Sequence, residues 1–163
     1  MSRPALLSAA LVFVVGSGIV LAGTADSAVT DTINARRGLM NQLAAMQTLI
    51  DARVAGGEYS PELYDLAQTA AASLDAFALL LPENTNLLGG APAVDGAETT
   101  AAAAIWDDLP AFQKLLHDAA ADARAASEAA DLAGFEASWS KVTASCASCH
   151  ETYVFFDPFA GLN

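Results

Sequence analysis

Apolar residues recur at helical spacing in four stretches of the chain, and the residues between these stretches are ones that interrupt helices. Within each stretch the apolar positions follow one another at intervals of three, four or seven, which is the repeat of one face of an α-helix. No stretch alternates polar and apolar residues as a half-buried β-strand does. Four amphipathic helices in this order predict an all-α protein, an antiparallel four-helix bundle.

The interrupting residues predict the helix boundaries. The four expected helices run from about Thr30 to Val54, from Ser60-Pro61-Glu62 to Pro82, from Thr99 or Thr100 onward, and from near Asp131 onward. A serine, then a proline and then an acid, as at residues 60–62, are typical of a helix start. Residues 82–98 lack periodicity and form one long connection. Within the third helix, Pro110 predicts a kink or a break.

Composition and charge describe an acidic globular domain. The chain is 54% hydrophobic and 16% charged, which favours one packed core over a disordered segment. We assign residues 29–163 to that single domain. The formal net charge of −12 argues against nucleic acid as a partner. An acidic surface keeps an exported protein soluble or attracts basic redox partners.

Residues 1–28 have the layout of a secretory signal peptide. Arg3 precedes an uncharged apolar stretch from Ala5 to Ala22, and small residues follow it. We therefore expect cleavage near residue 28 and export to the periplasm. An uncleaved membrane anchor is the alternative, because about 18 apolar residues approach the length that spans a bilayer.

Both cysteines of the chain lie near the C-terminus, in Cys146-Ala147-Ser148-Cys149-His150. This C-x-x-C-H arrangement is that of c-type haem attachment. Residues three apart lie on one face of a helix, so the two thiols can reach the two vinyl groups along one edge of a porphyrin. The histidine that follows can then ligate the iron. The motif predicts one covalent haem c, attached through Cys146 and Cys149 and ligated by His150.

Two other uses of the cysteines fit the sequence less well. A thioredoxin-like redox pair belongs near a helix start in a βαβ unit, whereas this pair lies at the end of a helical stretch. A structural zinc site needs four ligands, and the one further histidine, His117, is expected to be exposed. Many small cytochromes take their sixth ligand from a methionine downstream of the motif, but no methionine follows His150.

Three motifs in a fixed order resemble those of the class II cytochromes c, in particular cytochrome c prime. They are Arg36-Arg37-Gly38-Leu39-Met40, Ile105-Trp106 and the C-x-x-C-H motif near the C-terminus. The resemblance covers nearly all of residues 29–163. It implies a homodimeric four-helix bundle with one five-coordinate, high-spin haem. Such a haem binds a small diatomic gas, nitric oxide or carbon monoxide, and the family also transfers electrons to partners that the sequence does not identify.

The resemblance also implies roles for Met40 and Arg36. Met40 falls at the family's distal position, where an apolar side chain shields the iron in five-coordinate members and a methionine ligates it in low-spin members. A ligating thioether closes the sixth site and raises the reduction potential, so a low-spin His150/Met40 electron carrier is the alternative function. Arg36 lies one helical turn before Met40 and is expected to pair with a haem propionate. Arg37 is expected at the surface.

One position departs from the family pattern. Members commonly carry Arg or Lys four residues after the ligand histidine, where this chain has Val154. Tyr153 is expected to pack against the haem or the bundle, and the apolar tail after it to cover the proximal face or a subunit contact. No motif of a hydrolase or transferase is recognisable, so we expect a gas-binding or electron-transfer protein and not an enzyme.

Overall fold

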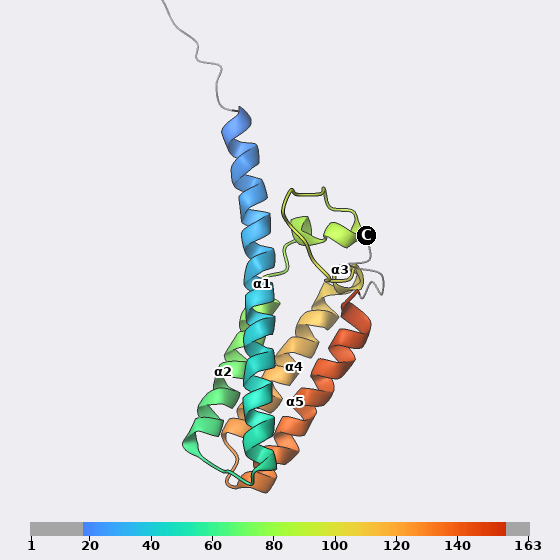
Figure 1. Ribbon diagram of the computed structural model, residues 1–163. Coiled ribbons are helices and arrows are strands. Elements are labelled where there is room, and N and C mark those ends of the chain that lie inside the picture. The colour runs from blue at the N-terminus through green and yellow to red at the C-terminus, as the bar shows by residue number, and fades with distance from the viewer. Residues whose placement is uncertain (1–17, 156–163) are drawn as a thin grey trace, which may run out of the picture.

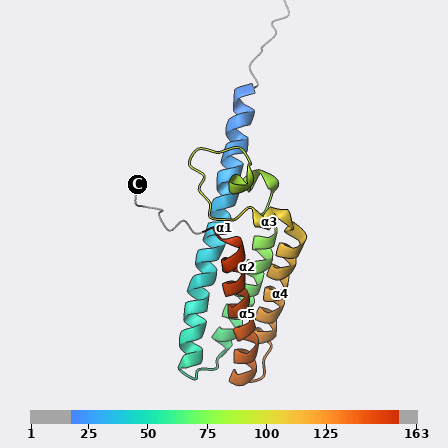
Figure 2. The same ribbon diagram turned by 90° about the vertical axis from the view of Figure 1, so that its right-hand side faces the viewer.

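Four long helices form the body of the protein in a computed structural model that describes residues 18–155, with side chains from residue 25. They are α1 (Gly18–Ala55), α2 (Pro61–Ala78), α4 (Leu109–Ser127) and α5 (Leu132–Tyr153). Figures 1 and 2 show short connections from α1 to α2 and from α4 to α5 at one end of the bundle. The long connection from α2 to α4 crosses the other end, where α5 also finishes. The predicted antiparallel four-helix bundle is confirmed.

Two of the predicted helix starts are confirmed by the local geometry. Helix α2 begins at Pro61, and Ser60 before it has the extended backbone of a cap residue although its side chain makes no capping hydrogen bond. Helix α5 begins at Leu132, and the Asp131 side chain accepts a hydrogen bond from the backbone N–H of Gly134 at 2.8 Å. A carboxylate there satisfies a backbone donor that the first turn of a helix leaves free.

The third predicted helix is interrupted and begins later than expected. One helical turn, α3 (Ala104–Asp107), precedes α4, so the predicted break near Pro110 is confirmed. Asp108 caps α4 by accepting a hydrogen bond from the Ala111 N–H at 3.1 Å. The predicted start at Thr99 or Thr100 is wrong, because the backbone there bonds to the chain that leaves α5.

That pairing joins two segments far apart in the sequence. The Phe155 N–H donates to the Thr100 carbonyl at 2.7 Å, and the Ala102 N–H donates to the Tyr153 carbonyl at 2.9 Å. Ala101 and Val154 form an isolated antiparallel bridge between these bonds. The pairing holds residues 100–102 extended across the end of α5, where a helix would need the same backbone groups.

The second and first helices also differ from their predicted bounds. Helix α2 ends at Ala78, before the predicted stop at Pro82, and two short 3-10 turns follow within the long connection. Helix α1 begins at Gly18, and Figure 1 shows its first turns extending past the bundle. Residues 1–17 of the predicted signal peptide, and Phe156 and Phe159 of the apolar tail, lie outside the described residues. Within residues 18–155 no helix is long and apolar enough to cross a membrane.

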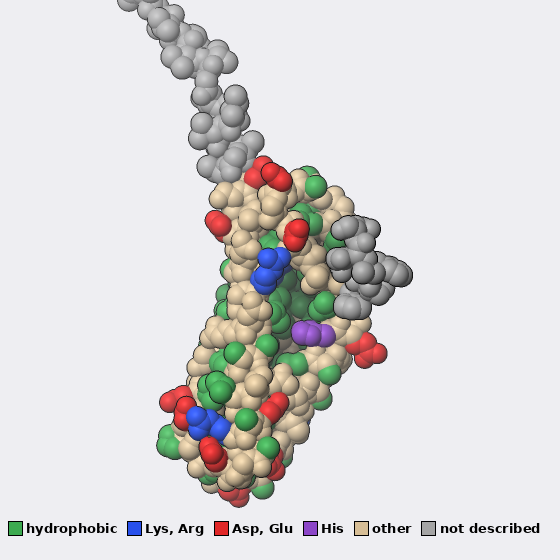
Figure 3. Space-filling model, viewed as in Figure 1, with side chains coloured by type: hydrophobic (Ala, Val, Ile, Leu, Met, Phe, Trp, Pro, Cys, Tyr) green, Lys and Arg blue, Asp and Glu red, His purple; other side chains and the backbone are tan. Residues whose placement is uncertain are grey.

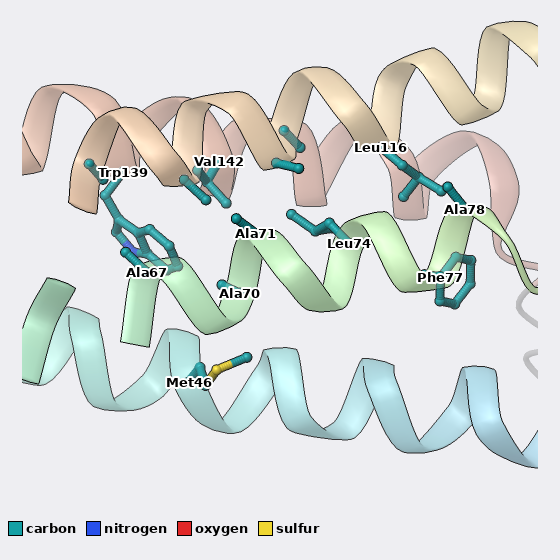
Figure 4. Close-up of a cluster of buried hydrophobic side chains, with 14 of the residues drawn as sticks. Met46, Ala67, Ala70, Ala71, Leu74, Phe77, Ala78, Leu116, Trp139 and Val142 are labelled. Carbon is teal, nitrogen blue, oxygen red and sulfur yellow. The ribbon is translucent and has the colours of Figure 1, made fainter. Parts of the chain in front are cut away.

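The core contains both small alanine side chains and large apolar side chains. Alanines are buried where α2 faces α4, among them Ala67 and Ala71 on α2 and Ala120 and Ala123 on α4, which lets these two helices pack closely. Figure 4 shows this cluster, with Met46 of α1 pointing toward α2. Among the large aromatic side chains, Trp106 is half-buried, and the buried ones include Phe77, Phe112, Phe135 and Trp139.

Candidate haem-binding site

Two adjoining cavities lie between α1 and α5, which scarcely contact each other directly. The larger cavity has a volume of about 430 Å³ and the smaller one of about 90 Å³. Both are lined by Met40 of α1, Leu116 of α4, and Cys149 and His150 of α5. Figure 3 shows this hollowed face, with apolar side chains at its floor and a histidine at its rim.

The cysteines and the histidine of the C-x-x-C-H motif lie together on the last turns of α5. Cys146 and Cys149 are half-buried and unbridged, and His150 is exposed. Burial raises the pKa of Cys146, and burial together with the nearby Cys146 raises the pKa of Cys149 to about 11. Redox-active cysteine pairs need the opposite shift, because the thiolate is the nucleophile. The pair is therefore poorly suited to thioredoxin-like chemistry.

Met40 contributes the α1 side of the site. Its side chain is half-buried and lines both cavities, and so faces the same space as His150. The smaller cavity is walled mainly by aliphatic side chains, among them Leu43 and Val142. An apolar wall of this kind admits a small uncharged molecule more readily than an ion.

Arg36 lies one turn before Met40 and is buried, with 4% of its surface exposed. One of its terminal nitrogens, Nη1, donates to the Leu80 carbonyl at 3.3 Å and to Thr85 Oγ1 at 3.0 Å. Its guanidinium carbon lies 5.6 Å from the ring centre of Trp106. The other nitrogen, Nη2, is buried and has no hydrogen-bond partner among the described residues.

The charge of Arg36 has no counterpart in the part of the chain that the structure describes. Burial lowers the pKa of Arg36, but a guanidinium stays charged at physiological pH. None of the ion pairs among residues 25–155 includes this side chain. A buried cation without a partner is costly, typically by several kcal/mol, so this site calls for an anion.

The chain around the larger cavity holds three further predicted residues. Arg37 is exposed, as expected, and its Nη2 donates to the Glu98 carbonyl at 2.6 Å across the cavity rim. Tyr153 packs edge-on against Phe112, with 4.7 Å between the ring centres, so its predicted packing against the bundle is confirmed. Val154 also lines this cavity.

His117 takes no part in the site. It lies on the surface of α4, where its Nδ1 is 2.8 Å from Asp75 Oδ1, and it lines neither cavity. Arg124 pairs with the other oxygen of the same carboxylate. The prediction that His117 is exposed is confirmed.

A protein-family profile described as Cytochrome C' matches residues 31–154. The chain belongs to this family. Its cofactor is accordingly one covalent c-type haem with iron. No curated protein sequence matches the chain significantly.

Solved structures of cytochromes c' have a similar fold. The protein from Thermochromatium tepidum is 24% identical with a TM-score of 0.61, and a reduced variant from Alcaligenes xylosoxidans is 20% identical with a TM-score of 0.65. A further cytochrome c', described as having an unusual ligand-controlled dimer dissociation, is 20% identical with a TM-score of 0.61. Each of these three alignments covers 78% of this chain and 97% of the other.

A second Alcaligenes xylosoxidans structure, a ferrous variant with bound NO, is 24% identical with a TM-score of 0.50. That alignment covers 77% of this chain and 96% of the other. At these identities the likenesses show the shared fold.

The residues of this cytochrome c' family member fit a haem on two counts. The paired cavities bring together the two thiols and the histidine of the motif, and the orphaned Arg36 Nη2 provides a buried donor for a haem carboxylate. All five predicted site residues border this space: Cys146 the smaller cavity, Arg36 the larger, and Met40, Cys149 and His150 both.

Sequence reasoning missed several residues of the site. Thr143 lines the smaller cavity and precedes Cys146 by three positions, so helical spacing from the cysteine would have found it. Leu115 also lines the smaller cavity, but it directly precedes the buried Leu116 and so lies off the apolar positions spaced by three, four or seven. Thr85 carries no signal in the sequence, because its contact with Arg36 joins the long connection to α1.

Proposed function

We propose that this chain is an exported haem protein that binds a small diatomic gas, nitric oxide or carbon monoxide, at an open position of a five-coordinate haem iron. The observation that carries the proposal is that His150 and Met40, on different helices, line the same two cavities, the smaller of which is walled mainly by aliphatic side chains. One side of the iron would then have a histidine ligand, and the other an apolar shield with space beside it.

The attachment follows from the motif on α5. Cys146 and Cys149 would bond to the two haem vinyl groups, and His150 would ligate the iron. When bound, the haem supplies an iron atom that can hold a diatomic gas on the side away from the histidine. The two thiols are half-buried and the His150 imidazole is exposed beside the cavities. This arrangement suits haem attachment, because no hydrogen bond to another described residue occupies the imidazole.

Arg36 would hold one haem propionate through Nη2. The propionate is the anion that this buried, unpaired guanidinium lacks, and a charge-assisted bond between them is stronger than a neutral one. The pairing would fix the haem at the α1 side while the thioethers fix it to α5. Arg37 remains at the rim with its Nη2 bonded to the Glu98 carbonyl.

The likeness to a cytochrome c' structure with bound NO supports gas binding. The likeness to a cytochrome c' that undergoes ligand-controlled dimer dissociation supports a homodimer here. Analytical ultracentrifugation of the holoprotein would then give twice the chain mass, whereas a single-chain mass would contradict the dimer. Electron transfer to a redox partner remains a second role of such a haem, and we assign the chain no catalysed reaction.

Gas binding is tested by titrating the reduced holoprotein with carbon monoxide and with nitric oxide while following the Soret band. The proposal predicts a saturable spectral change with one gas molecule per haem. An unchanged spectrum at saturating gas would reject it and favour the low-spin alternative, in which Met40 ligates the iron. That alternative has one observation in its favour, since the Met40 side chain already lines the same cavities as His150.

The attachment is tested with Cys146→Ser and Cys149→Ser, alone and together. Each single variant should keep one thioether, and the double variant should release its haem into acidified butanone. Retention of haem by the double variant would contradict the assignment. Ser148→Ala, between the two cysteines, is the matched control and should behave as the unaltered chain.

Export is proposed from residues 1–28, which have the layout of a signal peptide. N-terminal sequencing of the purified protein should find a start near residue 29, in the periplasmic fraction. A chain that retains Met1 and sediments with membranes would instead support the uncleaved anchor.

A further inference from the structure

The turn that follows α2 surrounds one end of the Arg36 side chain. Thr85, in the 3-10 turn η1 (Glu83–Thr85), has no exposed surface. Its hydroxyl donates to the Pro82 carbonyl at 2.7 Å and accepts from Arg36 Nη1 at 3.0 Å. The Leu80 carbonyl accepts from the same nitrogen at 3.3 Å. Both N–H bonds of Nη1 therefore end on this turn.

Trp106 holds the guanidinium from a second direction. Its ring lies 5.6 Å from the guanidinium carbon of Arg36, and its own Nε1 donates to the Leu81 carbonyl at 3.3 Å. The tryptophan is thus tied to the same turn as Thr85. A planar guanidinium has little freedom to rotate when one of its nitrogens donates two hydrogen bonds and an aromatic ring lies against it.

The turn itself is closely packed. Asn86, which follows Thr85, is buried, and a Cβ at Gly89 would overlap the Asn86 side chain. The Thr85 hydroxyl can act only as a hydrogen-bond acceptor toward Arg36. Because its single proton goes to Pro82, it must accept, and Arg36 must donate.

We propose that Thr85 is a positioning residue for the haem: by holding Arg36 Nη1, it leaves Nη2 as the donor that pairs with a haem propionate. The inference rests on the proposed function, which assigns Arg36 to that propionate. It adds that the assignment depends on a residue outside the four long helices. Nη1 has two partners and Nη2 has none among residues 25–155, which is the asymmetry that the proposal explains.

The test compares holoprotein variants by their midpoint reduction potential, measured by optical redox titration. Thr85→Val keeps the side-chain shape and removes both hydrogen bonds. A guanidinium that is held less firmly neutralises less of the propionate's negative charge, and that charge stabilises ferric over ferrous iron. The potential should therefore fall. Thr85→Ser restores the hydroxyl and should restore the potential.

Ser73→Ala is the matched control. Ser73 is also a buried hydroxyl, but it donates to the Thr69 carbonyl within α2 and lines neither cavity. Its loss should leave the potential unchanged. The propionate bending band in the resonance Raman spectrum gives a second readout, which Thr85→Val should shift and Ser73→Ala should not.

A double variant shows whether Thr85 acts through Arg36. Arg36→Gln should lower the potential by more than Thr85→Val does, and Thr85→Val added to Arg36→Gln should produce no further change. If Arg36→Gln lowers the potential and Thr85→Val does not, the positioning role is wrong and the propionate assignment survives. If neither lowers it, both are wrong. A Thr85→Val shift that Ser73→Ala reproduces, or that persists beside Arg36→Gln, also overturns the positioning role.

Discussion

Met40→Ala removes the sulfur and two carbons of a half-buried side chain that lines both cavities. Truncation of a fully buried methionine costs about 2 to 5 kcal/mol of unfolding free energy. Met40 already borders open space, so less packing is lost and we expect a cost of about 1 kcal/mol. Chemical denaturation of the holoprotein measures this difference.

The same change should speed the entry of carbon monoxide. If the gas must displace the Met40 side chain at a cost of about 1.4 kcal/mol, removal of that side chain raises the association rate roughly tenfold. The haem should stay high-spin, because the proposal gives Met40 no bond to the iron. Flash photolysis of the carbon monoxide complex gives the rate, and the absorption spectrum gives the spin state.

Met46→Ala is the control on the same helix. Met46 is buried with 6% of its surface exposed and lines neither cavity. It should cost more stability than Met40→Ala, about 2 to 5 kcal/mol, and leave the gas-binding rate unchanged. The reasoning is refuted if Met40→Ala leaves the rate unchanged, or if it converts a low-spin spectrum to a high-spin one, since the methionine would then be a ligand.

Two further predictions concern the bundle. Asp131→Ala removes the cap that accepts from the Gly134 N–H and should lower the unfolding free energy by about 1 kcal/mol in denaturant titrations, and an unchanged midpoint would contradict the cap. Burial raises the pKa of Asp75, but hydrogen bonds from His117 and Arg124 outweigh it and leave that pKa below its usual value. The unaltered protein should therefore have a higher unfolding free energy than Asp75→Asn at neutral pH, and this difference should diminish as the pH falls below about 4. A difference that stays constant down to pH 2 would contradict this.

The sequence predicted those features of the fold that depend on local chemistry. Helix α5 begins where Asp131 can cap it, α2 begins at Pro61, and the chain breaks beside Pro110. Each of these signals acts within one helical turn, so no knowledge of distant residues is needed. The apolar positions spaced by three, four or seven likewise indicated which helix faces are buried.

The features that were missed depend on contacts between distant segments. Residues 100–102 are extended because their backbone pairs with the backbone of Tyr153 and Phe155, and no local sequence pattern predicts that pairing. The position of Arg36 on an inward face could be predicted, whereas its bonds to Leu80 and Thr85 could not. They follow from how the long connection folds back over α1.

The spin state of the purified holoprotein tests the central proposal most directly. The absorption spectra of the ferric and ferrous forms, recorded without added gas, report whether a side chain occupies the sixth position. An open site beside Met40 predicts high-spin spectra in both oxidation states. Low-spin spectra in both would contradict it and make the chain an electron carrier with a closed iron.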